Sequence, residues 1–108
     1  MIYSSLTEPA PETKWRPAAD VYRTKSGWLL KFELAGVELS DVHITANERA
    51  LTVSGVRRDT MAEKECSQYS MEISYSRFER TIHLPCEIDS ARLDIEYKSG
   101  ILLVHVQA

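Results

Sequence analysis

Five residues have side chains best suited to catalyse a reaction or to hold a metal ion. They are His43, His83, His105, Cys66 and Cys86. Two metal ligands on one strand would stand at positions i and i+2 with a third group close by, and no two histidines have that spacing. A cysteine–histidine pair can act as a nucleophile, but catalysis also needs an orienting group and an oxyanion-binding loop, which no motif supplies. The sequence therefore predicts no enzyme, no metal site and no cofactor.

Other patterns argue against phosphate binding and membrane insertion. The four glycines never cluster, so no loop resembles those that cradle phosphates. Lys and Arg number 13 against 16 Asp and Glu, whereas nucleic-acid binding needs a basic surface. No run approaches the roughly 18 apolar residues of a membrane span, and two cysteines without a second pair are typical of reduced thiols. We expect a cytoplasmic protein with no nucleic-acid partner and no membrane span.

The chain divides into a short arm and one domain. Residues 1–17 hold three of the four prolines, and their apolar side chains stand singly. Those side chains are Ile2, Tyr3, Leu6 and Trp15. Such a stretch cannot bury enough surface to offset its ordering entropy, so it is predicted to be a flexible N-terminal arm. Residues 18–108 are long enough for a single folded domain.

Within the domain, apolar residues recur with a period of two. The alternating stretches are 28–34, 42–46, 50–56, 69–75, 78–84, 93–97 and 101–106. This period is that of a strand with one buried face, and no segment carries a sustained helical stripe. Ser99-Gly100 suits a hairpin turn between the last two stretches. The pattern predicts an all-β protein, an immunoglobulin-like antiparallel sandwich of seven or eight strands.

The stretch from Arg57 to Gln68 is a long loop, and an alternating segment follows it. Loops above about 12 residues are uncommon in compact domains and are often functional. One interpretation is a simple surface excursion. The interpretation that we favour is that residues 66–73 leave their own domain and pair with the edge strand of a second copy. Tyr69, Met71 and Ile73 would then lie in a dimer interface.

Several short motifs occur in a fixed order along the domain. They are Pro-Ala-Ala-Asp-Val-Tyr at 17–22, Glu-Leu-Ala-Gly-Val at 33–37, Leu-Thr-Val-Ser-Gly at 51–55 followed by Arg57, Phe-Glu-Arg at 78–80, Leu-Pro at 84–85 and Gly-Ile-Leu at 100–102. In this order and spacing they resemble the alpha-crystallin domain of the small heat-shock proteins, over residues 15–107. The resemblance implies a strand-exchange loop at the position of the long loop.

The resemblance also implies a function. Members of this family are ATP-independent holding chaperones, so the chain is expected to bind partly unfolded client proteins and suppress their aggregation. They form homodimers by strand exchange, and Arg80 matches an arginine that pairs with acidic groups at that contact. Because no Ile-x-Ile tail motif follows the last predicted strand, we expect a dimer, with small higher oligomers as the alternative.

Two surfaces are candidates for client binding. The first is the arm, through its four apolar side chains. The second is a groove that receives the tail motif in the family, here lined by Val42, Ile44, Leu93 and Ile95; the alternative is that these four belong to the sandwich core. A different class of function is a p23-like co-chaperone or adaptor that binds one folded partner. That group lacks the exchange loop, so residues 57–73 argue against it.

Overall fold

A computed structural model describes residues 14–61 and 64–107 of the chain. These residues form seven β-strands and one 3-10 helix, η1 (Leu39–Asp41). The strands are β1 (Ala19–Arg23), β2 (Gly27–Glu33), β3 (Val42–Asn47), β4 (Ala50–Val56), β5 (Arg77–His83), β6 (Arg92–Lys98) and β7 (Ile101–Gln107). In this described part of the chain, no helix is long and apolar enough to cross a membrane.

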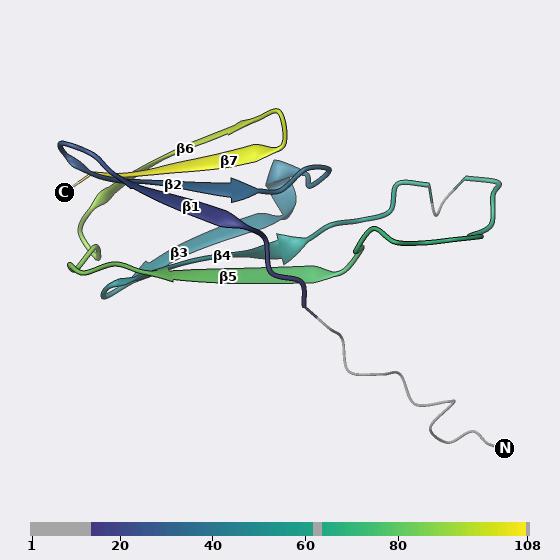
Figure 1. The fold of residues 1–108 in the computed structure, drawn as a ribbon, viewed down its shortest axis with the longest axis horizontal. Coiled ribbons are helices and arrows are strands. Elements are labelled where there is room, and N and C mark those ends of the chain that lie inside the picture. The colour runs from purple at the N-terminus through teal and green to yellow at the C-terminus, as the bar shows by residue number, and fades with distance from the viewer. Residues whose placement is uncertain (1–13, 62–63, 108) are drawn as a thin grey trace, which may run out of the picture.

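The strands make two antiparallel sheets that face each other (Figure 1). One sheet has the order β1-β2-β7-β6 and the other the order β3-β4-β5. The predicted antiparallel sandwich of seven or eight strands is therefore confirmed, with seven. β4 and β5 pair from Ala50–His83 to Val56–Arg77, so residues 57–76 leave and re-enter the sheet at adjacent positions.

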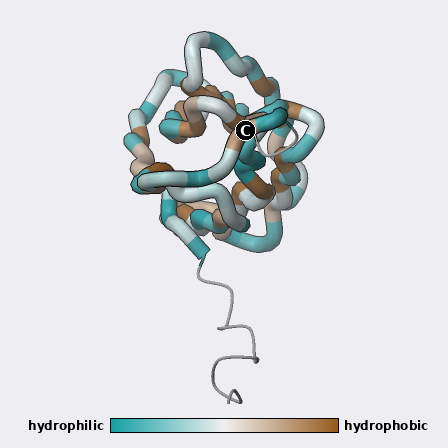
Figure 2. Tube along the Cα trace, turned by 90° about the vertical axis from the view of Figure 1, so that its right-hand side faces the viewer, coloured by the Kyte–Doolittle hydropathy of each residue, from teal (hydrophilic) through white to brown (hydrophobic). Residues whose placement is uncertain are grey.

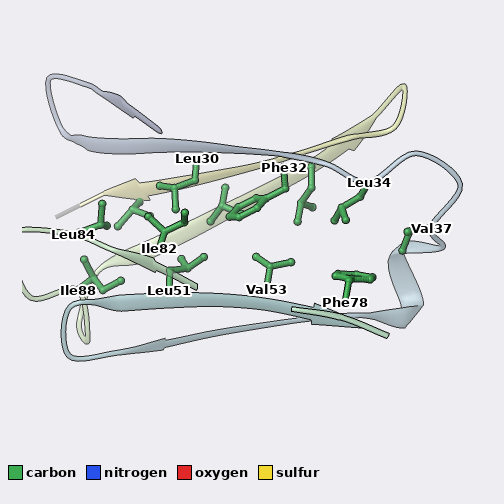
Figure 3. Packing of buried hydrophobic residues seen from close by; sticks show 13 residues of the cluster. Leu30, Phe32, Leu34, Val37, Leu51, Val53, Phe78, Ile82, Leu84 and Ile88 are labelled. Atoms are coloured by element: carbon green, nitrogen blue, oxygen red, sulfur yellow. The ribbon is translucent and has the colours of Figure 1, made fainter. Parts of the chain in front are cut away.

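The core lies between the sheets and takes one face of each strand. β7 is the clearest case, because Leu102, Val104 and Val106 are buried while the residues between them are half-buried. Phe32 of β2 and Phe78 of β5 are the largest fully buried side chains, and they fill the space from opposite sheets (Figure 3). Burying each such side chain contributes about 1.5–3 kcal/mol. Viewed along the long axis, hydrophobic and hydrophilic residues alternate along the chain (Figure 2).

The turn between β6 and β7 is the hairpin that the sequence predicted. Ser99 and Gly100 both have positive φ, 54° and 79°, as a two-residue type I′ turn requires. A Cβ atom on Gly100 would lie 3.0 Å from the Cα atom of Ala35, so this position also needs the absence of a side chain. The turn fixes the register in which Leu102 faces Tyr97.

The start of the described part of the chain differs from the expectation. Residues 1–13 of the predicted arm lie outside the described residues. Trp15 and Pro17, which we assigned to the arm, pack on the sandwich instead. Pro17 is buried, and Trp15 is half-buried against the core and forms a parallel bridge with Phe78. This bridge covers the edge of β5, whose backbone groups would otherwise be unpaired there.

Candidate interaction site

The loop of residues 57–76 projects from one end of the sandwich (Figure 1). We call residues 69–75 the apolar loop segment, because four apolar side chains alternate in it with Ser70, Glu72 and Ser74. All four are exposed: Tyr69 by 101%, Met71 by 47%, Ile73 by 60% and Tyr75 by 37%. The predicted strand over 69–75 is absent from the single chain, since no strand of the same chain pairs with it. Its apolar pattern has no cover within one copy.

A free sheet edge lies on the same molecule. β1 is the outermost strand of the four-stranded sheet, and Val21 and Tyr22 are exposed on it. The backbone N–H of Glu33 donates to the carbonyl of Ala18. Counting from Ala18, every second residue of β1 therefore directs its N–H and C=O groups toward β2. The backbone groups of Ala19, Val21 and Arg23 consequently point away from the sheet. This edge can accept one further strand.

Arg80 lies on β5, on the inward face that it shares with Phe78 and Ile82. Its Nη1 donates to the carbonyl oxygen of Pro17 at 2.9 Å. Its Nε is buried and has no hydrogen-bond partner among the described residues. An unsatisfied buried donor costs about 1–3 kcal/mol, so a rearrangement that gives this nitrogen an acceptor would be favourable. The structure does not bring Arg80 into contact with the predicted dimer residues of its own loop.

The four groove candidates lie on the two edge strands β3 and β6. Ile95 pairs with buried Val104, so it belongs to the inward face, yet it is 45% exposed. Leu93 on the same strand, and Val42 and Ile44 on β3, are half-buried against the core. The alternation of inward and outward side chains is thus obeyed on both edge strands, but the inward apolar side chains there are only partly covered. Three of the four side chains contribute to the core as well as to this opening.

The arm residues proposed for client binding fall into two groups, those outside the described residues and Trp15. Ile2, Tyr3 and Leu6 lie outside the described residues. Trp15 is the exception, because it is held on β5 and its indole Nε1 donates to the carbonyl oxygen of Ser76 at 3.2 Å. The carbonyl that accepts this bond ends the loop of residues 57–76. Trp15 therefore belongs to the loop base as much as to the arm.

The three histidines stand on three different strands, β3, β5 and β7. His105 is close to one carboxylate, with its Nε2 3.0 Å from Oε2 of Glu96. Both cysteines are exposed and free. Within the described residues, no group of three or more histidine, cysteine or acidic side chains is placed to hold a metal ion.

The motif comparison included Arg57, the first residue after β4, but sequence reasoning assigned it no role. Its Nε donates to the carbonyl of Ser74 at 2.9 Å and its Nη1 donates to that of Ala35 at 3.1 Å. Its guanidinium carbon lies 4.1 Å from the centre of the Trp15 ring. The sequence signal for a contact was weak: a lone tryptophan just before the first strand, and an arginine at the end of a shared motif. Neither indicates the other at a separation of 42 positions.

Comparison with known proteins places this geometry in a family. The sequence model of the Hsp20/alpha crystallin family matches residues 20–108. The chain belongs to this family of small heat-shock proteins. The fold and the predicted resemblance are thereby confirmed, and the loop lies at the position where the motifs had indicated it.

Two relatives illustrate the match. Small heat shock protein C2 of Rickettsia felis is 31% identical over 104 residues, which cover 96% of this chain and 65% of that protein. Heat shock protein 16 of Schizosaccharomyces pombe is 32% identical over 90 residues, covering 82% of this chain and 63% of that protein. The chain spans only 51–65% of the length of three relatives: small heat shock proteins C2 and C4 of Rickettsia felis and spore protein SP21 of Stigmatella aurantiaca.

Solved structures agree with the sequence comparison. The structure of heat shock protein 16.0 from Schizosaccharomyces pombe superposes with a TM-score of 0.77 at 29% identity, covering 87% of each chain. That of HSP18.5 from E. histolytica gives 0.70 at 26% identity, covering 87% of this chain and 88% of that one. These two solved structures thus share the sandwich fold of this chain.

Proposed function

We propose that this chain is an ATP-independent holding chaperone, which binds partly unfolded proteins and suppresses their aggregation. The observation that carries the proposal is the apolar surface left open at the strand edges of the sandwich. Ile95 faces inward and is nevertheless exposed, on a strand that has no outer neighbour. Partly unfolded proteins expose apolar segments in extended form, and an open apolar edge can bind many such segments without a pocket.

The client surface that we propose is the groove between β3 and β6. Val42, Ile44 and Leu93 would contribute half-buried side chains to it, and Ile95 would contribute an exposed one. Removing apolar surface from water is favourable by about 25 cal/mol per Å² whatever the direction of the client chain. Such binding tolerates clients of different sequence. The arm residues Ile2, Tyr3 and Leu6 are proposed as a second client surface.

We further propose that two copies form a dimer by exchanging the apolar loop segment. The segment would add to β1 of the second copy, where the backbone groups of Val21 and its alternate neighbours point outward. Pairing would remove Tyr69, Met71 and Ile73 from water and provide a strand for their alternating pattern. We propose that Arg80, whose Nη1 donates to the carbonyl of Pro17 just before β1, also contributes to this contact. We place this dimer in the cytoplasm.

The p23-like alternative predicts a sandwich without an exchange loop. The projecting loop and the four exposed apolar side chains of its apolar loop segment favour the holding chaperone instead.

The proposal is tested by an aggregation assay without ATP. A heat-stressed model protein is incubated with the wild type, with Ile95→Lys or with Leu39→Lys, and turbidity is recorded. Leu39 is a matched control, because it is 46% exposed against 45% for Ile95 but lies on η1, outside the groove. We expect wild type and Leu39→Lys to suppress turbidity equally, and Ile95→Lys to need about three times more protein, since a lysine ammonium in the groove opposes apolar contact.

Two outcomes would contradict the proposal. One is a wild type that leaves turbidity unchanged at a several-fold excess over the client. The other is an equal loss for both lysine variants, which would separate the activity from the groove. Light scattering on the same samples measures the assembly: a dimer or a small oligomer is expected, and a mass of twelve subunits or more would contradict it.

A further inference from the structure

Trp15 is fixed by its backbone and by its ring. Its N–H donates to the carbonyl of Arg77 at 3.0 Å, and its own carbonyl accepts from the N–H of Glu79 at 3.2 Å. The indole lies 5.2 Å from the Phe78 ring, centre to centre, with the planes tilted by 53°. A tilted aromatic pair of this kind is worth about 0.5–1.5 kcal/mol beyond the area it buries. The segment before β1 is thus attached to β5 directly beneath the loop.

Arg57 covers the other face of this arrangement. Its guanidinium lies over the Trp15 ring and also donates to the carbonyls of Ser74 and Ala35. One side chain therefore connects three segments that are distant in sequence: the residues just before β1, the turn after β2 and the end of the loop. Arginine suits this position because its planar fork donates in two directions while it stacks on an aromatic ring.

The carbonyl of Ser76 is where the two residues meet. It accepts the backbone N–H of Arg57 at 3.1 Å and the indole N–H of Trp15 at 3.2 Å. With the Ser74 carbonyl held by the Arg57 side chain, the last three residues of the loop are tied down. Residues 64–73, by contrast, project with exposed side chains. The direction in which the loop leaves the sandwich is set at this base.

We infer that Trp15 and Arg57 form a clamp that aims the apolar loop segment and couples the docking of the N-terminal segment to dimer formation. This inference rests on the proposed exchange of the loop. A loop that is already aimed loses less conformational freedom when it pairs with a second copy, so the clamp strengthens the dimer. Coupling between two binding events is reciprocal, so dimer formation in turn favours docked Trp15. A ligand that pulls the residues before Trp15 away from β5 would therefore weaken the dimer.

The first test compares Arg57→Gln with Arg58→Gln by sedimentation velocity over a range of concentrations. The two variants lose the same charge from adjacent positions. Arg58 pairs with Asp41 at 3.0 Å, and this hydrogen bond and the charge of Asp41 raise the pKa of Arg58, so it is a cation at neutral pH. We expect the dimer dissociation constant to rise roughly five- to tenfold in Arg57→Gln, because two charge-assisted hydrogen bonds are lost. Arg58→Gln should stay within about twofold of wild type. Equal dissociation constants in two folded variants would overturn the clamp.

The second test measures how the exposure of Trp15 depends on dimer formation. The sequence has two tryptophans, so Trp28→Phe leaves Trp15 as the single reporter for acrylamide quenching. We expect quenching to fall as concentration carries the protein from monomer to dimer. With Arg57→Gln added, quenching should be high at every concentration. A wild type that stays monomeric would contradict both the proposed exchange and the clamp. A wild type that dimerises while Trp15 quenching stays constant would contradict the clamp alone.

Discussion

β7 and the apolar loop segment carry the same alternating pattern in the same chain, and they end in opposite environments. In β7, Leu102 and Val104 are fully buried, because β2 and β6 flank the strand and the second sheet covers its inner face. In the loop segment, Tyr69 and Ile73 are exposed, because no strand of the same chain lies beside them. The difference teaches that a period of two specifies the face of a strand, but not which molecule covers that face.

The strongest way to break the comparison is to damage the covered region. Phe32→Ala removes a fully buried ring between the sheets and should lower the free energy of unfolding by about 3–5 kcal/mol, through lost burial and the cavity left behind. Urea denaturation followed by fluorescence measures this. Leu39→Ala, at an exposed position, is the control and should cost less than about 1 kcal/mol. Similar losses for the two variants would mean that the core is not where the structure places it.

A change in the apolar loop segment should weaken the dimer and leave the stability of the monomer almost unchanged. Ile73→Asp should leave the urea midpoint of the monomer almost unchanged, since Ile73 is exposed in one copy. It should raise the dimer dissociation constant roughly 10- to 100-fold, because pairing would bury a charge in place of an apolar side chain. Met61→Asp is the control, an exposed position in the same loop outside the apolar loop segment. A dimer that withstands Ile73→Asp as well as Met61→Asp would remove the segment from the interface.

A smaller effect is expected where only one backbone group is lost. Val21→Pro removes an N–H that points away from β2, and proline is tolerated on edge strands at such positions. The monomer should stay folded by circular dichroism, while the dimer dissociation constant rises roughly fivefold, as loss of one hydrogen bond predicts. Val21→Thr keeps both the N–H and the branched shape, and should behave as wild type. If Val21→Pro dimerised normally, β1 would not be the receiving edge.

Much of the fold follows from local rules. The inward positions of β2, β5 and β7 follow from alternation alone, since a strand with one buried face must place every second residue inside. The hairpin at Ser99-Gly100 follows from the need for positive φ at both turn residues. The sheet order did not follow from these rules, and the motifs shared with the small heat-shock proteins indicated only the sandwich and its long loop.

The site is less accessible from sequence, for two physical reasons. Ile95 and Leu93 obey the same alternation on the same edge strand, yet Ile95 is 45% exposed and Leu93 is half-buried against the core, so alternation does not tell which edge residue is covered. Trp15 stands in a proline-rich stretch with few apolar neighbours, and its ring is held by Arg57 from a distant part of the chain. Edges and long-range contacts depend on how strands are arranged in space, which a periodic pattern does not encode.

The most direct test of the central claim maps the exchange by disulfide trapping in a Cys66→Ser, Cys86→Ser background. One copy carries Val21→Cys, and a second copy of different mass carries Met71→Cys, Ile73→Cys or Tyr75→Cys in turn. After mixing and mild oxidation, the account predicts a cross-linked species containing one chain of each mass, for at least one of the three positions. Absence of this species for all three positions would contradict the exchange of the loop. In a second experiment, one chain carries Val21→Cys together with one of the three loop cysteines, and rapid formation of a disulfide within that single chain would also contradict the exchange.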